Sequence, residues 1–130
     1  MQGNTPTGKI GKIKAEVIAA LGLSVKANTP IYLGVSNINH MIKSHPADFQ
    51  IYGSYIQQIL DAPDFVGINP KDQSIEYVKE FIVNNEYVKV AVRVSTSGIY
   101  FARSLYILNS NRVHNFINKG TLIPLTKSDE

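Results

Sequence analysis

Residues 86–108 read EYVKVAVRVSTSGIYFARSLYIL, and this stretch carries the clearest structural signal in the chain. Four valines, Val88, Val90, Val92 and Val94, alternate with Lys, Ala, Arg and Ser, which is the period of a strand with one buried face. Residues 99–108 supply a partner strand. The stretch therefore predicts a β-hairpin.

The turn of this hairpin decides which side chains share a face. A loop of three residues, 96–98, would pair Ser95 with Ile99 and would place Gly98 where a left-handed backbone is favoured. A loop of four residues would shift the register by one step and turn one strand over. We favour the shorter loop.

Arg93 and Arg103 are the candidate anion-binding groups of the hairpin. In the favoured register Arg93 pairs with Phe101 and Ala91 with Arg103, so both guanidinium groups share one face; the longer loop would separate them. Two guanidinium groups on a rigid sheet can bind phosphate bidentately and stabilise the charge that develops in phosphoryl transfer. The alternative is ion pairing with acidic side chains of the middle segment, for example Glu76, Glu80 or Glu86.

The aromatic and hydroxyl side chains of the second strand divide between the two faces. Tyr100, Ser104 and Tyr106 would lie on the valine face, where we expect core positions. Phe101 lies beside the arginines, where it would either stack a nucleic-acid base or take a half-buried core position.

Before the hairpin, the apolar spacing predicts mainly helices. The expected elements are a helix over residues 8–22 that ends at Gly22, a short strand at 31–33, a helix from Ser36 or Asn37 to about His45, and a helix at 47–60 that ends before Pro63. The stripe expected to be buried on the last helix comprises Phe49, Tyr52, Ile56, Ile59 and Leu60.

From residue 65 onward the pattern changes to short strands and turns. The expected elements are a strand at 65–68, a turn at 69–72, an extended or partly helical stretch at 74–83, a turn at 84–85, a helix at 110–118 closed by Gly120, and an edge strand or tail at 122–125. Helices first and an antiparallel sheet afterwards favour an α+β fold. We expect a disordered leader at 1–7, one domain at 8–126 and a tail at 127–130.

Composition narrows the function classes. The chain has 130 residues, 44% of them hydrophobic, and no cysteine, so disulfides, zinc fingers, thiol catalysis and iron–sulfur clusters are excluded. It also lacks a P-loop, a Rossmann glycine motif, HExxH and GxSxG. No apolar run is long enough to span a membrane, and the polar start is unlike a signal peptide.

Charge is distributed unevenly along the chain. Residues 1–45 carry five Lys and one Glu, residues 46–90 carry three Lys and seven acids, and residues 91–130 carry five basic residues and two acids. An acidic middle between two basic ends indicates either a polarised binding surface or an ordinary solvated one.

The histidines are the candidate groups for proton exchange near neutral pH. The chain has three, His40, His45 and His114. His40 and His45 lie around one expected helix end, and their spacing of five is unsuited to a metal pair on one helix face. The alternative is that one of them only caps the helix end.

Four runs together resemble a known family. They are NINHMIKSHPADF (37–49), DAPDFVGINP (61–70), SIEYVKEF (74–81) and VKVAVRVSTSGIYFARSLYIL (88–108). Their order, a histidine-bearing helix with His-Pro, a Pro-Asp strand, and an Arg-Ser/Thr hairpin with a second Arg, resembles phage-associated members of the Barnase–EndoU–colicin–RelE (BECR) nuclease superfamily. The resemblance covers about residues 31–125.

This resemblance implies a fold and an activity. The fold would have N-terminal helices packed on a curved antiparallel sheet of four or five strands. The activity would be a metal-independent endoribonuclease without a cofactor, in which the ribose 2′-OH attacks the adjacent phosphate to give a 2′,3′-cyclic phosphate. Such an enzyme would act in the cytoplasm of the producing or target cell as a toxin or phage effector. The expected partners are RNA, especially tRNA, and an acidic immunity protein.

Carried over to this sequence, the resemblance implies a role for each candidate residue. His40 is the first choice for general base or acid and His45 the second, with Arg93 and Arg103 on the phosphate. Ser95 or Thr96 would donate a hydrogen bond to it. The expected nucleic-acid-binding residues are Lys43, Lys71, Lys79, Lys89 and Phe101. The alternative is a non-catalytic module of a phage or mobile-element protein that binds nucleic acid or a protein.

Overall fold

A computed structural model gives the structure of residues 7–125. Its strands are β1 (Gly8–Ile13), β2 (Thr29–Leu33), β3 (Phe65–Ile68), β4 (Ile75–Phe81), β5 (Glu86–Val94), β6 (Tyr100–Leu108) and β7 (Leu122–Pro124). Its helices are α1 (Ala15–Leu21), α2 (Val35–Ser44), α3 (Pro46–Tyr52), the short 3₁₀ turn η1 (Gly53–Tyr55), α4 (Ile56–Asp61) and α5 (Ser110–Asn118). The leader expected at 1–7, apart from its last residue, and the tail expected at 127–130 lie outside the described residues.

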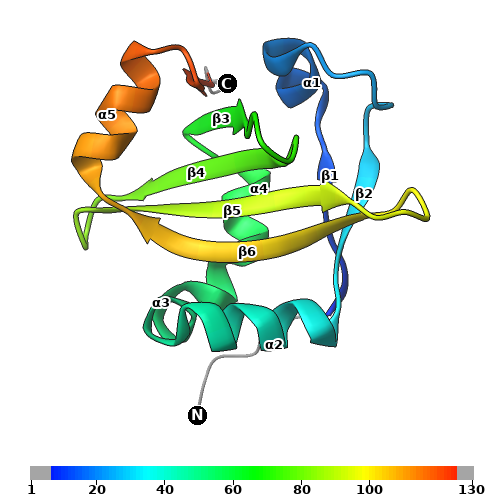
Figure 1. The fold of residues 1–130 in the computed structure, drawn as a ribbon, viewed down its shortest axis with the longest axis horizontal. Helices are drawn as coiled ribbons and strands as arrows, with labels where there is room; N and C mark the ends of the chain where they lie inside the picture. Colours follow the sequence, from blue (N-terminus) through cyan, green and yellow to red (C-terminus); the bar gives the residue numbers. More distant parts are fainter. Residues whose placement is uncertain (1–6, 126–130) are drawn as a thin grey trace.

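The strands form a single mixed sheet in the order β1-β2-β6-β5-β4-β3-β7. All pairs are antiparallel except β2 with β6. In Figure 1 the β5–β6 hairpin crosses the middle of the molecule, and β1 and β2 run steeply across its right-hand end. The α+β class is confirmed, whereas the expected antiparallel sheet of four or five strands is wrong: the sheet has seven strands and one parallel pair.

The hairpin has the predicted loop and an unpredicted bulge. The Ser95 N–H donates to the Ile99 carbonyl at 2.8 Å, and Gly98 has a φ of +87°. Farther along the strands the register shifts, so that Ala91 faces Ser104 while the next residue, Val92, faces Ala102. The extra residue on β6 is Arg103.

This bulge corrects the predicted pairing of Ala91 with Arg103. One additional residue on β6 reverses the side on which the following side chains point. Ser104 therefore pairs with Ala91, and Tyr106 with Lys89, on the face that also carries Arg93. The expectation that Ser104 and Tyr106 lie with the valines is wrong.

The helix expected at 8–22 is wrong in its first half. Residues 8–13 form β1, and only α1 is helical. Ile10 and Ile13 are both buried although they are three residues apart, because the pairing with β2 is irregular between Lys9 and Gly11. The spacing of three between these two isoleucines, which had suggested a helix, thus comes from an irregular strand. Gly22 ends α1 as expected, with a φ of +65°.

The helices between residues 35 and 61 follow the prediction with local differences; α2 and α3 lie along the lower edge in Figure 1, and α4 lies behind the hairpin. The N-cap of α2 is Gly34, not Ser36 or Asn37; the Asn37 side chain instead accepts the Gly34 N–H at 2.9 Å. The helix expected at 47–60 is divided into α3, η1 and α4. At the division, a Cβ on Gly53 would lie 2.8 Å from the Phe49 ring, so the close approach requires glycine.

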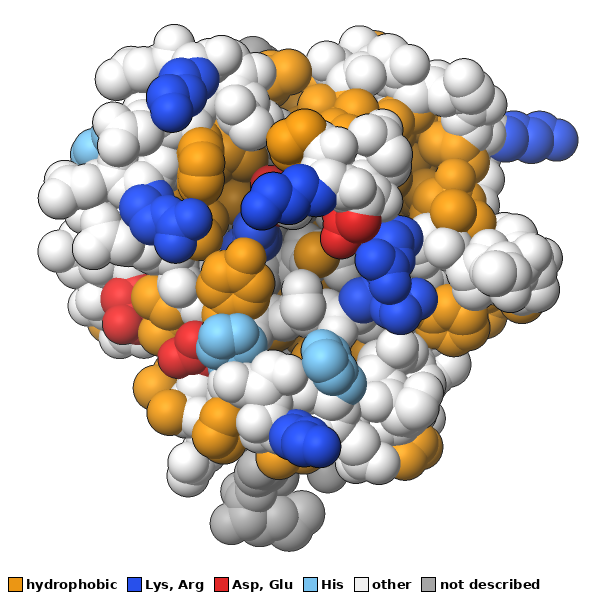
Figure 2. Space-filling view, viewed as in Figure 1, with side chains coloured by type: hydrophobic (Ala, Val, Ile, Leu, Met, Phe, Trp, Pro, Cys, Tyr) orange, Lys and Arg blue, Asp and Glu red, His pale blue; other side chains and the backbone are white. Residues whose placement is uncertain are grey.

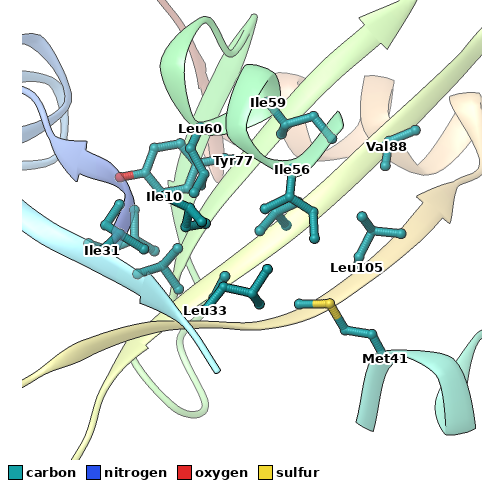
Figure 3. Packing of buried hydrophobic residues seen from close by; sticks show 14 of the residues in the cluster. Ile10, Ile31, Leu33, Met41, Ile56, Ile59, Leu60, Tyr77, Val88 and Leu105 are labelled. Atoms are coloured by element: carbon teal, nitrogen blue, oxygen red, sulfur yellow. The ribbon is translucent and has the colours of Figure 1, made fainter. Parts of the chain in front are cut away.

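The remaining predicted elements are confirmed, and within the stretch expected at 74–83 residues 75–81 form the strand β4, while residues 82–83 belong to the following turn. The predicted stripe of α3 and α4 is buried against the valine face of β5. Figure 3 shows this core, in which Met41, Ile56, Ile59 and Leu60 of the helices lie together with Leu33, Tyr77, Val88 and Leu105 of the strands. Within residues 7–125, no helix is both long and apolar enough to cross a membrane.

The opposite face of the sheet is only partly covered. A smaller cluster there joins Val78 and Leu108 of the sheet to Val113 of α5 and Leu122 of β7. Beside this cluster the same face of β5 and β6 carries Lys89, Arg93 and Ser104. The polar part of this face is where a site can form.

Candidate active site

A cleft of about 440 Å³ opens on the polar face of the sheet. Its lining comes from α2, from the turn between β3 and β4, and from β5 and β6, and comprises Ser36, Asn37, His40, Asp72, Ser74, Ala91, Arg93, Arg103 and Ser104. Figure 2 shows Lys and Arg side chains gathered over this face, with histidine side chains below them over the helices.

His40 reaches the cleft from α2. This helix packs along β6, and its first turn brings Ser36 and Asn37 into the same wall as His40. The imidazole is exposed, and its Nε2 lies 3.4 Å from the Ser44 hydroxyl. The structure thus brings together His40, Arg93 and Arg103. The hairpin register had placed the two arginines on one face, and only the resemblance had joined His40 to them.

The β-bulge shapes the wall formed by β6. Consecutive side chains of a regular strand point to opposite faces. At the bulge, however, the consecutive residues Arg103 and Ser104 both line the cleft. The bulge therefore adds a hydroxyl beside the second guanidinium group.

Asp72 faces Arg93 across the cleft. Its Oδ2 lies 3.4 Å from Arg93 Nη1, and its Oδ1 accepts the Ser74 N–H at 3.0 Å. Hydrogen bonds from Ser74, and secondarily the Arg93 charge, lower the pKa of the Asp72 carboxyl. The alternative expected from the sequence, an ion pair with an acidic side chain of the middle segment, is thus confirmed for Arg93, but the partner is Asp72 and not one of the glutamates. Glu76 pairs with Lys89, and Glu86 accepts a hydrogen bond from the Tyr52 hydroxyl.

Lys89 forms a buried ion pair next to the cleft. Its Nζ lies 2.9 Å from Glu76 Oε2, each side chain is only 9% exposed, and Nζ also lies 4.7 Å from the Tyr106 ring centre. Burial lowers the pKa of Lys89, but hydrogen bonds and charge from Tyr106 and Glu76 outweigh it and raise the pKa overall. Lys89, predicted to bind nucleic acid, is engaged within the protein.

His45 lies outside the cleft lining. Its ring stacks on Tyr106 with centroids 4.9 Å apart, and its Nδ1 lies 4.0 Å from Asp48 Oδ2. Asp48 also accepts the Ile107 N–H of β6 at 3.0 Å. Through these contacts His45 links the start of α3 to Tyr106 of β6.

The predicted hydroxyl donors belong to the hairpin loop. Ser95 Oγ accepts the Ile99 N–H at 3.2 Å and lies 2.8 Å from Ser97 Oγ. Thr96 is exposed in the same loop. Neither Ser95 nor Thr96 is part of the cleft lining.

The other predicted nucleic-acid contacts are dispersed. Lys43 and Lys71 are exposed, on α2 and on the β3–β4 turn, and the Lys79 ammonium donates to the Ala62 carbonyl at 3.0 Å. Phe101 lies on β6 directly opposite Arg93. Of these four residues, only Phe101 is paired with a cleft residue, Arg93, on the neighbouring strand.

Sequence reasoning missed five polar residues of the lining, Ser36, Asn37, Asp72, Ser74 and Ser104. The sequence does contain a signal for Asp72 and Ser74. An aspartate at a turn often accepts a hydrogen bond from the backbone N–H two residues later, as Asp72 does from Ser74. Ser104 depends on the bulge, for which the sequence has no comparable signal.

The assembled groups suit a reaction at a phosphate. Two guanidinium groups provide charge and directed N–H donors, and Ser36 and Asn37 of the first turn of α2 add polar residues to the same lining. An exposed imidazole nearby can exchange a proton. Together they can bind a phosphodiester and assist displacement at phosphorus.

Comparison with known proteins bears directly on this interpretation. Residues 8–115 match the model of the family described as phage-Barnase-EndoU-ColicinE5/D-RelE like nuclease3. No curated protein and no solved structure matches the chain. The matched range contains every residue of the cleft and confirms the resemblance. The chain therefore belongs to the phage-Barnase-EndoU-ColicinE5/D-RelE like nuclease3 family, whose description is that of nucleases.

Proposed function

We propose that this nuclease is an endoribonuclease that cleaves without a metal ion, by attack of a ribose 2′-OH on the adjacent phosphate. The observation that carries the proposal is the joint placement of His40, Arg93 and Arg103 in one cleft, although they come from α2, β5 and β6. Family membership supports a nuclease, and the cleft chemistry supports this substrate and route.

The arginines bind the scissile phosphate. Arg93 is 38% exposed at its side chain and Arg103 is half-buried, so both can reach a ligand while their strands hold them in place. As the 2′-oxygen adds to phosphorus, negative charge builds on the phosphoryl oxygens. Guanidinium groups that are already in place stabilise that charge without further reorganisation.

His40 exchanges the proton. The neutral imidazole accepts the proton of the 2′-OH, the 2′-oxygen forms a bond to phosphorus, and the bond to the 5′-oxygen of the next nucleotide breaks. The leaving oxygen takes a proton from solvent at the open side of the cleft. The products are a 2′,3′-cyclic phosphate and a 5′-hydroxyl end, and no water is consumed in this step.

RNA is the proposed substrate because it contains its own nucleophile. The cleft presents cations, hydroxyls and an imidazole, a set that activates and stabilises a nucleophile brought by the substrate. We propose tRNA as the first RNA to examine, for an enzyme that acts as a toxin or phage effector in a cytoplasm. An acidic immunity protein would complement the cationic cleft.

A defined RNA tests the chemistry. We would incubate the protein, in EDTA, with an oligonucleotide cut at one position, and with the same oligonucleotide carrying a single 2′-deoxy nucleotide on the 5′ side of that position. We expect cleavage of the first only, with a cyclic phosphate identified by mass spectrometry. Equal cleavage of both, or ends with a 5′-phosphate, would rule out the proposed route.

The contact between Asp72 and Arg93 favours a second candidate, a module that binds nucleic acid or protein without cutting. A carboxylate in the cleft partly neutralises one guanidinium group. Salt-dependent binding of intact RNA, with no product in the assay above, would support this second candidate.

A further inference from the structure

Beyond the cleft, one row of side chains crosses neighbouring strands. Arg93 of β5 lies opposite Phe101 of β6, Phe101 lies opposite Tyr32 of β2, and Tyr32 lies opposite Lys9 of β1. Directly paired residues point to the same side of a sheet. Because neighbouring strands are about 4.8 Å apart, the row extends roughly 14 Å from the arginine.

The middle of the row is aromatic. The rings of Tyr32 and Phe101 have centroids 6.3 Å apart and are tilted by 52°, and both side chains are partly exposed. In the described part of the chain, the two hydrophobic clusters form without these rings. Tyr100, the neighbour of Phe101, does pack against the larger cluster, which shows that the two aromatic residues differ in role.

The far end of the row is cationic. Lys9 is exposed on β1, an edge strand, and lines an open groove of about 660 Å³ between β1 and α4. Lys12, Gln57 and Gln58 also line this groove, but α4 packs on the valine face, so the two glutamines are not part of the row. The row thus begins and ends on cations, with two rings between them.

We propose that this row binds single-stranded nucleic acid that leads away from the cleft. A phosphate sits at Arg93, the next bases stack on Phe101 and Tyr32, and a following phosphate meets Lys9. Every base has a π-face, so such a track accepts different sequences, and the flanking cations follow the backbone. The proposal rests on the proposed function in one respect, that the cleft binds a phosphate of the same strand.

Binding to a strand that cannot be cut tests the track separately from catalysis. We would titrate the protein into a fluorescein-labelled single-stranded DNA of ten mixed nucleotides and follow anisotropy. We expect Tyr32→Leu and Phe101→Leu each to weaken binding about tenfold, since each removes one stacking surface. Tyr32→Phe keeps the ring and should bind within about twofold of the wild type.

Two further variants sharpen the test. Tyr55→Leu removes an aromatic side chain that is 41% exposed on η1, outside the row, and should leave affinity unchanged. Lys9→Gln should reduce the slope of log affinity against log salt concentration by about one. Thermal unfolding midpoints equal to that of the wild type would establish that the leucine variants are folded.

The outcomes separate the two proposals. If the wild type binds the DNA, the leucine variants lose affinity and RNA is never cut, the track stands and the ribonuclease fails. If RNA is cut but Tyr32→Leu and Phe101→Leu bind like the wild type, the ribonuclease stands and the track is wrong. If Tyr32→Phe is as weak as Tyr32→Leu, or the wild type binds no oligonucleotide, stacking on the row is also wrong.

Discussion

Asp72 Oδ2 lies 3.4 Å from Arg93 Nη1 in the lining of the cleft. The two side chains are 41% and 38% exposed, so the pair contributes about 0–1 kcal/mol to folding. A phosphate that binds Arg93 must compete with this carboxylate. With RNA as the proposed substrate, we therefore expect Asp72 to oppose substrate binding.

Replacement of this carboxylate should strengthen binding. We expect Asp72→Asn to lower the Kd for single-stranded RNA by about threefold to tenfold, since roughly 1 kcal/mol of repulsion is removed. Anisotropy titrations in low salt measure the effect, with Glu16→Gln as the control, because Glu16 is an exposed carboxylate on α1 that lines neither the cleft nor the groove beside Lys9. A weaker complex for Asp72→Asn would mean that Asp72 holds Arg93 in its binding position.

The buried pair of Lys89 and Glu76 should matter for stability. We expect Lys89→Met to lower the free energy of unfolding by about 3 kcal/mol, because Glu76 would remain buried with the Asn69 amide at 3.2 Å but without its cation. Lys14→Met is the control, since Lys14 pairs with Asp61, a side chain that is 71% exposed, and should cost no more than about 1 kcal/mol. Urea unfolding measures both free energies. Similar losses for Lys89→Met and Lys14→Met would contradict the view that the buried pair matters more for stability.

The raised pKa of Lys89 predicts a pH window. Its pKa in the folded protein lies above the unfolded value of 10.5, so the charged form is stabilised by folding. This contribution is fully present below that value and is lost as the pH rises through the folded-state pKa. We expect the stability difference between the wild type and Lys89→Met to stay constant from pH 7 to about 10 and to shrink above it. A difference that already declines between pH 7 and 9 would contradict this assignment.

Gly67 should tolerate no side chain. A Cβ at this position of β3 would lie 2.3 Å from the Thr121 carbonyl oxygen, which is backbone and cannot turn away. We expect Gly67→Ala to destabilise the protein by about 2 kcal/mol. Gly11→Ala is the control, because its Cβ would meet Leu60 at an ordinary 3.5 Å. Equal thermal midpoints for the two variants would show that β7 moves aside at little cost.

Tyr77 carries a buried hydroxyl on β4. Its OH has no hydrogen-bond partner among residues 7–125, and burial raises its pKa. Figure 3 shows the hydroxyl directed toward β1 near Ile10. We expect Tyr77→Phe to raise the free energy of unfolding by about 1 kcal/mol, since a desolvated polar group is removed. Chemical denaturation measures it, and a loss of stability would mean that the hydroxyl is hydrogen-bonded in solution.

The sequence predicted elements better than it predicted registers. The valine alternation and Gly98 identified the hairpin and its loop, because strand period and turn chemistry are local properties. The N-terminal error had a physical cause: an irregular strand placed Ile10 and Ile13 on one side, which mimics helical spacing. Such irregularity depends on the partner strand and is not visible in a local pattern.

The candidate site was predictable in its histidine and its two arginines, but not in Asp72 or in its uncharged polar residues. The side chains of His40, Arg93 and Arg103 were singled out by their chemistry, and the structure brings them together. Ser104 enters the cleft through the bulge, a feature of strand pairing over a distance. Asp72 faces Arg93 only after β4 pairs with β5. In both cases a long-range register decided which residue lines the cleft.

The dependence of RNA cleavage on His40, Arg93 and Arg103 tests the central claim most directly. We would measure cleavage rates of total tRNA in EDTA for the wild type, His40→Ala, Arg93→Ala and Arg103→Ala, with His114→Ala as control, since His114 lies exposed on α5 outside the cleft. The account predicts a loss of at least a hundredfold for His40→Ala and comparable losses for both arginine variants, with His114→Ala unchanged. Cleavage that is absent in the wild type, or equal in all five proteins, would contradict it.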